Sequence, residues 1–128
     1  MSDPAAEESH GTLPTTNQVV MRLSQLSRAL EAKTQEIADL DREWVTAKAA
    51  FKVAYARTFL TTPGSMDVRK QTAVQETADL DFTAELAEAK VRAARESIRT
   101  LRDQLDVGRS LGAAARAEFQ ATGWGQHT

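Results

Sequence analysis

Apolar side chains recur at alternating steps of four and three residues between positions 19 and 58, and this spacing limits the fold of the 128-residue chain more than any other feature. Twelve positions follow the spacing, and ten of them are apolar. A 3.5-residue period held over more than five heptads is typical of a coiled-coil seam. A helix of this length cannot bury its apolar stripe alone, so it requires a partner helix. The twelve positions are Val19, Leu23, Leu26, Leu30, Lys33, Ile37, Leu40, Trp44, Ala47, Phe51, Ala54 and Thr58.

The second half of the chain carries a matching stripe and is the expected partner. Pro63 and Gly64 interrupt the first pattern, because proline lacks a backbone N–H and clashes with the preceding helical turn. Ser65 is suited to cap the next helix, with Asp67 in the first turn. A short connection between two long helices favours an antiparallel hairpin, in which residue i lies opposite about 127 − i. The second stripe comprises Ala73, Thr77, Leu80, Ala84, Ala87, Val91, Ala94, Ile98, Leu101, Leu105, Gly108, Gly112, Ala115 and Phe119.

These patterns predict an all-α protein, a long antiparallel two-helix hairpin that forms a coiled coil. The first residues are low in hydrophobicity and broken by Pro4, Gly11 and Pro14, so we expect them to be disordered. A cap for the first helix is expected at one of residues 15–17. The predicted organisation is a disordered leader over 1–16, a hairpin over 17–122 made of helix 17–61, turn 62–65 and helix 66–122, and a loose tail over 123–128.

Several classes of function are not expected from the composition. The chain has no cysteine, and neither His10 nor His127 has a partner at ligand spacing, so we expect no metal and no cofactor. No apolar run approaches the ~20 residues of a membrane span, and the acidic start "MSDPAAEESHGT" lacks the features of a signal peptide. We therefore expect a cytoplasmic protein without membrane contact. No catalytic motif is present and a two-helix rod offers no pocket, so an enzyme is not expected.

The predicted hairpin tip is basic. Residues 42–70 hold six basic and two acidic side chains. Cations interleaved with aromatic rings are typical of surfaces that bind single-stranded nucleic acid, because the cations contact phosphates and the rings stack on bases. The alternative is that Phe59, Leu60 and Met66 staple the turn while the cations only solvate it. The candidate nucleic-acid-binding residues here are Lys48, Lys52, Tyr55, Arg57, Arg69 and Lys70.

A second basic feature is a row of arginines at intervals of seven, Arg95, Arg102, Arg109 and Arg116. Arginine binds phosphate through two N–H groups, so a linear row suits a nucleic-acid backbone. Arg95, Arg99 and Arg102 are the candidate contacts. The alternative is a solvated face with i,i+4 ion pairs, namely Glu88–Arg92, Arg99–Asp103 and Arg102–Asp106.

Two glycines interrupt the second helical pattern near its end. Glycine inside a helix costs ~1 kcal/mol relative to alanine, so the pair suggests close approach of another helix. The alternative is that the helix ends at Gly112. The candidate oligomerisation residues are Gly108, Leu111, Gly112, Ala115 and Phe119.

The combination "W…YARTFL…GS…RK" followed by "LRDQLDVGRSL" resembles small helical phage proteins of recombination and replication modules, and is similar to UvsY-like recombination mediators. The resemblance covers roughly residues 40–122. It implies an oligomeric protein that binds single-stranded DNA, a recombinase or a single-strand-binding protein in the host cytoplasm. It also implies that the tip contacts DNA through Lys52, Tyr55, Arg57, Arg69 and Lys70, and that the arginine row and the end at Gly108 and Gly112 serve strand tracking and assembly.

The expected function is therefore that of a phage DNA recombination or replication accessory. The alternative is a non-enzymatic coiled-coil adaptor or inhibitor that binds a host protein without nucleic-acid contact. A virion or tail-assembly component is a third alternative.

Overall fold

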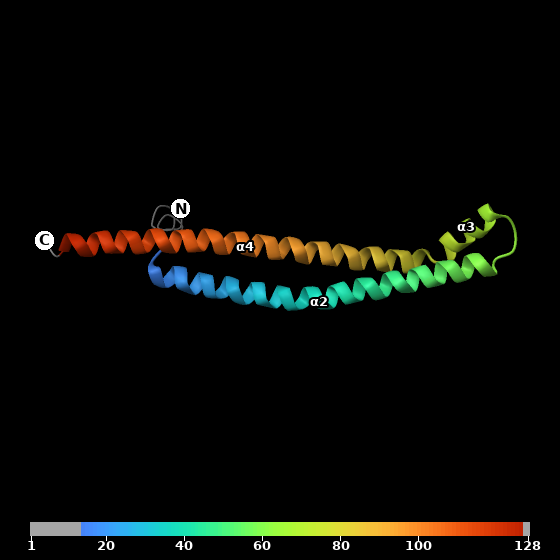
Figure 1. The fold of residues 1–128 in the computed structure, drawn as a ribbon, viewed down its shortest axis with the longest axis horizontal. Helices are drawn as coiled ribbons and strands as arrows, with labels where there is room; N and C mark the ends of the chain where they lie inside the picture. The colour runs from blue at the N-terminus through green and yellow to red at the C-terminus, as the bar shows by residue number, and fades with distance from the viewer. Residues whose placement is uncertain (1–13, 127–128) are drawn as a thin grey trace, which may run out of the picture. The chain divides into compact units, whose positions relative to one another are not determined.

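The computed structural model describes residues 14–126, which form three helices (Figure 1). They are α2 (Thr16–Thr61), α3 (Met66–Glu76) and α4 (Ala78–Gln126). These helices hold 94% of the described residues, which include no strand, so the all-α class is confirmed. Most of the predicted leader and the last two residues of the predicted tail lie outside the described residues.

The start of α2 is fixed by Thr15. The Thr15 Oγ1 accepts a hydrogen bond from the Gln18 backbone N–H at 3.2 Å, and the Gln18 Oε1 accepts one from the Thr15 N–H at 2.9 Å. This reciprocal arrangement is a capping box, which satisfies two backbone donors that the first turn leaves free.

The connection between α2 and α3 contains the predicted break. Gly64 has φ +114°, a conformation that L side chains rarely adopt, so glycine is required there. Ser65 caps α3 by accepting a hydrogen bond from the Val68 N–H at 3.3 Å, and Asp67 lies in the first turn.

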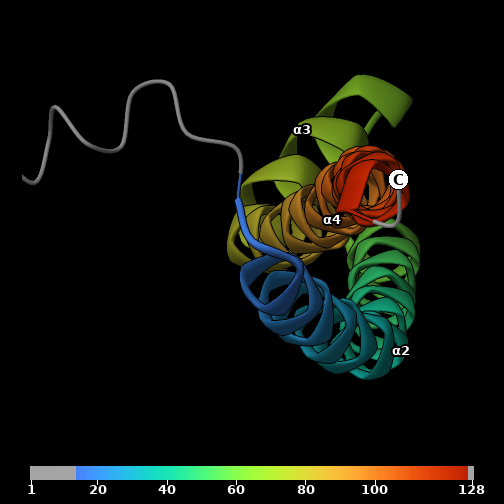
Figure 2. The ribbon, with the colours of Figure 1, turned by 90° about the vertical axis from the view of Figure 1, so that its left-hand side faces the viewer.

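The described residues fall into two compact units, and in each of them segments of α2 and α4 lie side by side (Figures 1 and 2). Unit 1 combines the part of α2 up to Glu31 with the part of α4 from Thr100, and unit 2 is Ala32–Arg99. All twelve positions of the first predicted stripe are buried or half-buried, and so are those of the second except Leu80 and Phe119. The apolar core consists of Val19, Leu26 and Leu105 in unit 1 and Ala73, Ala84, Ala87, Val91 and Ala94 in unit 2.

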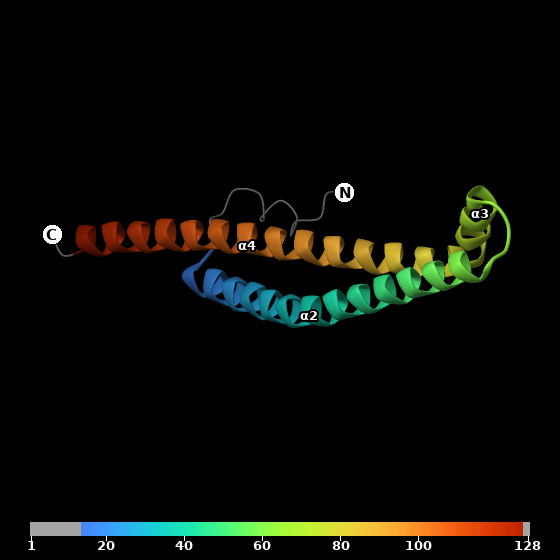
Figure 3. The same ribbon diagram turned by 45° about the vertical axis from the view of Figure 1, so that its right-hand side comes forward.

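The structure divides the predicted helix 66–122 at Thr77. This residue has φ −106° and ψ 10°, and its buried Oγ1 donates to the Ala73 carbonyl oxygen at 2.6 Å. Such a bond often accompanies a bend, and the helix is interrupted here because the dihedral angles of Thr77 depart from helical values. In Figure 3, α3 lies at an angle to α4 beside the end of α2. At the other end, α4 continues to Gln126, beyond the expected end at residue 122.

The pairing between the helices also differs from the expected one. A residue i opposite 127 − i would place Glu43 near residue 84, yet Glu43 pairs with Lys90 at 3.1 Å. In the same way, Gly108 rather than residue 104 lies against Leu23. Because α3 does not continue the line of α4, its residues cover less length along α2. Each α2 position therefore lies opposite a residue of α4 that comes later in the chain than 127 − i.

Candidate functional site

The aromatic residues of α2 in unit 2 contact one another and a lysine. The Lys48 Nζ lies 5.5 Å from the centroid of the Trp44 ring, within the range of a cation–π contact. The rings of Phe51 and Tyr55 lie 6.1 Å apart at 55°, a tilted arrangement that aromatic pairs favour. Tyr55 and Phe59 are both half-buried, so only part of each ring is accessible to a base.

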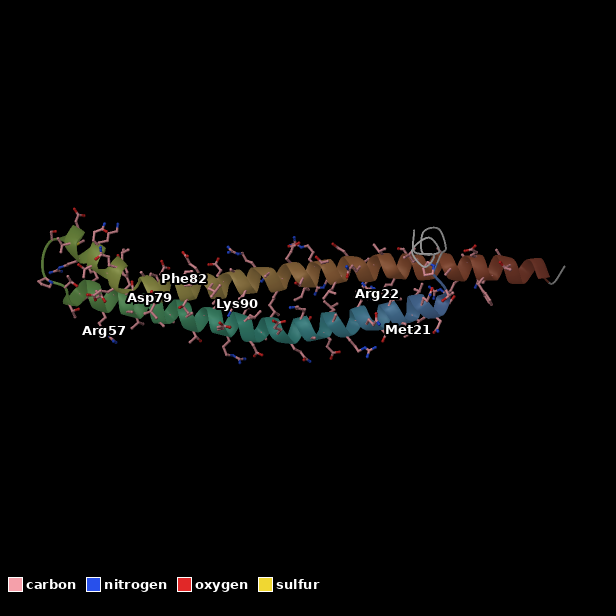
Figure 4. The ribbon with its side chains drawn as sticks, turned by 180° about the vertical axis from the view of Figure 1, so that it is seen from behind. Met21, Arg22, Arg57, Asp79, Phe82 and Lys90 are labelled. Carbon is pink, nitrogen blue, oxygen red and sulfur yellow. The ribbon has the colours of Figure 1, made fainter. Side chains whose placement is uncertain are left out.

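The predicted tip cations lie at the end of unit 2 where α2 and α3 meet. Lys52, Arg57 and Lys70 are exposed, and none of them forms an ion pair with a described residue. Arg57 projects from α2 away from α4 (Figure 4). Arg69, in the first turn of α3, is half-buried, and its Nε is buried without a hydrogen-bond partner in this part of the chain. Lys52, Arg57 and Lys70 at this end of unit 2 therefore form no ion pair with a described carboxylate, while Asp67 lies in the same turn of α3 as Arg69.

The arginines on α4 differ, because Arg95 and Arg109 of the row and the neighbouring Arg92 and Arg99 each form an ion pair with a carboxylate. The predicted Arg92–Glu88 pair is present at 3.8 Å. The other two predicted pairs are wrong, since Arg99 pairs with Glu96 at 3.5 Å and Asp106 pairs with Arg109 at 3.5 Å. Arg95 reaches across to Asp41 of α2 at 3.6 Å, which leaves Arg102 as the one candidate of this row without an ion pair among the described residues.

The two glycines of the predicted oligomerisation surface lie against α2 of the same chain. A Cβ built on Gly108 would lie 2.7 Å from the Leu23 Cδ2, and one on Gly112 would lie 3.2 Å from the Val19 Cγ1. Packing inside unit 1 is thus sufficient to explain both glycines. Ala115 is half-buried, while Leu111 and Phe119 are exposed.

Sequence reasoning missed an apolar face on α2. Val45, Val53 and Leu60 are all more than half exposed. Residues 44–60 contain only three charged side chains and no acidic one. This low charge could have indicated the apolar face from the sequence. We call this face the α2 outer row, which consists of Val45, Ala49, Val53, Ala56 and Leu60.

A hollow beside α2 in unit 2 is lined in part by charged residues that pair within the chain. This open hollow of about 500 Å³ lies between α2 and the start of α4. The charged residues that line it form ion pairs within the chain: Arg42 pairs with Asp39 at 3.5 Å, and Glu43 pairs with Lys90. No group of three potential metal ligands occurs in residues 14–126. Among the described helices, none is both long and apolar enough to cross a membrane.

Comparisons with protein-family models, with curated proteins and with solved structures find no match to this chain.

Proposed function

We propose that this protein is a non-enzymatic helical binding protein that holds single-stranded nucleic acid at the end of unit 2 where α2 meets α3. The observation that carries the proposal is the unpaired positive charge of Lys52, Arg57 and Lys70. Phosphate contacts supply most of the affinity of such surfaces, and the half-exposed ring of Tyr55 offers a stacking partner for a base.

The proposal also covers the oligomeric state and the location of the protein. The chain would act as an antiparallel hairpin of the coiled-coil type that self-associates in the cytoplasm. The resemblance to phage proteins of recombination modules favours a role as an accessory that organises single-stranded DNA or contacts a recombinase on it. The ion pairs of Arg92, Arg95, Arg99 and Arg109 favour the end of unit 2 over the arginine row as the first DNA contact.

Fluorescence anisotropy of a labelled oligo-dT probe across a salt series tests this function. We expect binding at low salt that weakens steeply as salt rises. The variant Lys52→Ala, Arg57→Ala, Lys70→Ala removes the three exposed cations that form no ion pair with a described residue. It should weaken binding and lower the slope of log K against log salt by about 2, because each phosphate contact on a single strand contributes ~0.7.

The matched control removes three paired arginines from α4, in Arg92→Ala, Arg99→Ala, Arg109→Ala. These arginines already pair with carboxylates, so the control should retain most of the affinity and slope of the unmodified chain. Absence of binding at low salt, or an equal loss in both triple variants, would show that the end of unit 2 is not a nucleic-acid site.

A second candidate function is that of an adaptor or inhibitor that binds another protein. The exposed α2 outer row favours it, since contiguous apolar surface marks protein contacts. Capture of a partner from nuclease-treated lysate by the unmodified chain, lost in Val53→Asp, would support this function. Capture that is unchanged in the variant would speak against it.

A further inference from the structure

The segment 44–60 of α2 is apolar on two opposite sides. One side contains Phe51 and Ala54, which belong to the half-buried stripe. The other side is the α2 outer row, whose members step by four, four, three and four residues and so share one face of the helix. Val45 is 63% exposed, Val53 56% and Leu60 75%. Contiguous apolar surface on a second side of a helix marks a contact with a partner, so the outer row is a candidate for a second contact.

The start of α4 carries a smaller apolar face of the same kind. Phe82 is 66% exposed and Leu86 is 47% exposed, and they lie one turn apart. Ala84 and Ala87, in contrast, are buried on the other side of the helix. Figure 4 shows Phe82 and Asp79 near the start of α4. We call this face the α4 outer row, which consists of Phe82, Leu86, Ala89 and Ala93.

The two rows carry flanking charges of opposite sign. Lys48, Lys52 and Arg57 flank the α2 outer row, and no acidic residue occurs between Glu43 and Asp67. The α4 outer row begins among carboxylates instead, while Lys90 and Arg92 near its other end pair with Glu43 and Glu88. None of the three cations beside the α2 outer row, and none of the three carboxylates named next, forms an ion pair within the described chain. The carboxylates that flank the α4 outer row are Asp79, Asp81 and Glu85.

We propose that the α2 outer row of one copy of this chain docks on the α4 outer row of a second copy. The contact would cover apolar surface on both helices and place lysines and an arginine beside carboxylates, which favours encounter and fixes orientation. A contact between two α2 outer rows would instead bring six cations together, and such like-charge contacts cost several kcal/mol.

The two rows differ in length and in identity. The α2 outer row extends about 23 Å along its helix and the α4 outer row about 17 Å, at ~1.5 Å per residue, so the longer row can cover the whole of the shorter one. Because each copy contributes a different surface, the contact is heterologous and leaves one free row at each end of a pair. Association should therefore continue beyond the dimer. Self-association is part of the function proposed above, and this inference rests on that part alone, without any need for nucleic acid.

Sedimentation velocity of the full chain across a wide concentration range tests the contact. The unmodified chain should form species larger than a dimer as concentration rises. Val53→Asp and Phe82→Asp should each remain monomeric, because each puts a carboxylate into one apolar row. Val20→Asp is the matched control, since Val20 is 58% exposed but lies in unit 1, and it should associate as the unmodified chain does.

An equimolar mixture of Val53→Asp and Phe82→Asp gives the decisive result. The first variant keeps an intact α4 outer row and the second an intact α2 outer row, so the mixture should form a 1:1 complex and stop there. Circular dichroism of each variant checks that the helices persist.

The inference is overturned if the unmodified chain stays monomeric, if the mixture does not combine, or if Phe119→Asp rather than Val53→Asp abolishes association. Oligo-dT binding is a separate readout, so a failure of the contact and a failure of nucleic-acid binding are distinguishable.

Discussion

Gly108 of α4 lies directly against Leu23 of α2, so close that a Cβ at position 108 would come within 2.7 Å of the Leu23 Cδ2. Gly112 has the same relationship with Val19, at 3.2 Å. Glycine normally weakens a helix by ~1 kcal/mol relative to alanine. The close approach of two helices inside unit 1 is therefore sufficient to account for the two glycines of α4.

Gly108→Leu should lower the free energy of unfolding by about 1–3 kcal/mol, because the added side chain has no room beside Leu23. Thermal and urea unfolding followed by circular dichroism would measure the change. Ala114→Leu is the control on the same helix, and we expect a change within about 0.5 kcal/mol because Ala114 is exposed. Adding Leu23→Ala to Gly108→Leu should cost less than the sum of the two single changes. Strict additivity would mean that the two side chains do not share this space.

The buried faces of the helices could be predicted from the sequence, while their pairing could not. A heptad pattern determines which side of each helix is apolar, and that side agrees with the observed burial almost throughout. The same pattern repeats every three or four residues, so a shift of one turn leaves apolar residues facing one another. The step from residue 104 to Gly108 opposite Leu23 is a shift of this kind.

The sequence contains a sign of the break between α3 and α4 at Thr77, but another pattern conceals it. Thr77 precedes Asp79 and Asp81, and acidic residues in a first turn are typical of a helix start. Position 77 also fits the second apolar stripe, and that periodicity concealed the signal. The partner of Arg95 could not be predicted, since the Arg95–Asp41 ion pair depends on which turns of two helices meet. Arg99 has carboxylates at both three residues before and four residues after it on the same helix, and the sequence does not show which one it pairs with.

Thr77→Val should destabilise unit 2 by about 1 kcal/mol. The change keeps the shape of the side chain but removes the hydroxyl that donates to the Ala73 carbonyl oxygen in a buried setting. Thr83→Val removes an equivalent bond, from the Thr83 Oγ1 to the Asp79 carbonyl oxygen at 2.9 Å, at an exposed position. Urea unfolding should show a clear loss for Thr77→Val and almost none for Thr83→Val. Equal losses would show that burial of the hydroxyl is not what matters.

Ala87→Leu should also destabilise unit 2, by about 1–3 kcal/mol. Ala87 is 2% exposed, so three additional carbon atoms must displace neighbouring side chains. Ala38→Leu makes the same chemical change at an exposed position of the same unit and should alter stability by less than about 0.5 kcal/mol. A melting temperature that is unchanged in Ala87→Leu would contradict the close packing of this face.

The pairing of Glu43 with Lys90 can be tested by exchanging the charges. Glu43→Lys and Lys90→Glu should each lower stability slightly, because each single reversal places two like charges where an ion pair at 3.1 Å now lies. The double variant should recover most of the loss. The side chains are about half exposed, so we expect a coupling energy of only about 0.2–1 kcal/mol that decreases as salt rises. Glu43→Lys combined with Glu85→Lys is the control, since residue 85 lies near the position that a symmetric hairpin would place opposite Glu43. Coupling in the Glu43–Lys90 cycle and none in the control would establish the observed pairing, and the reverse would restore the symmetric one.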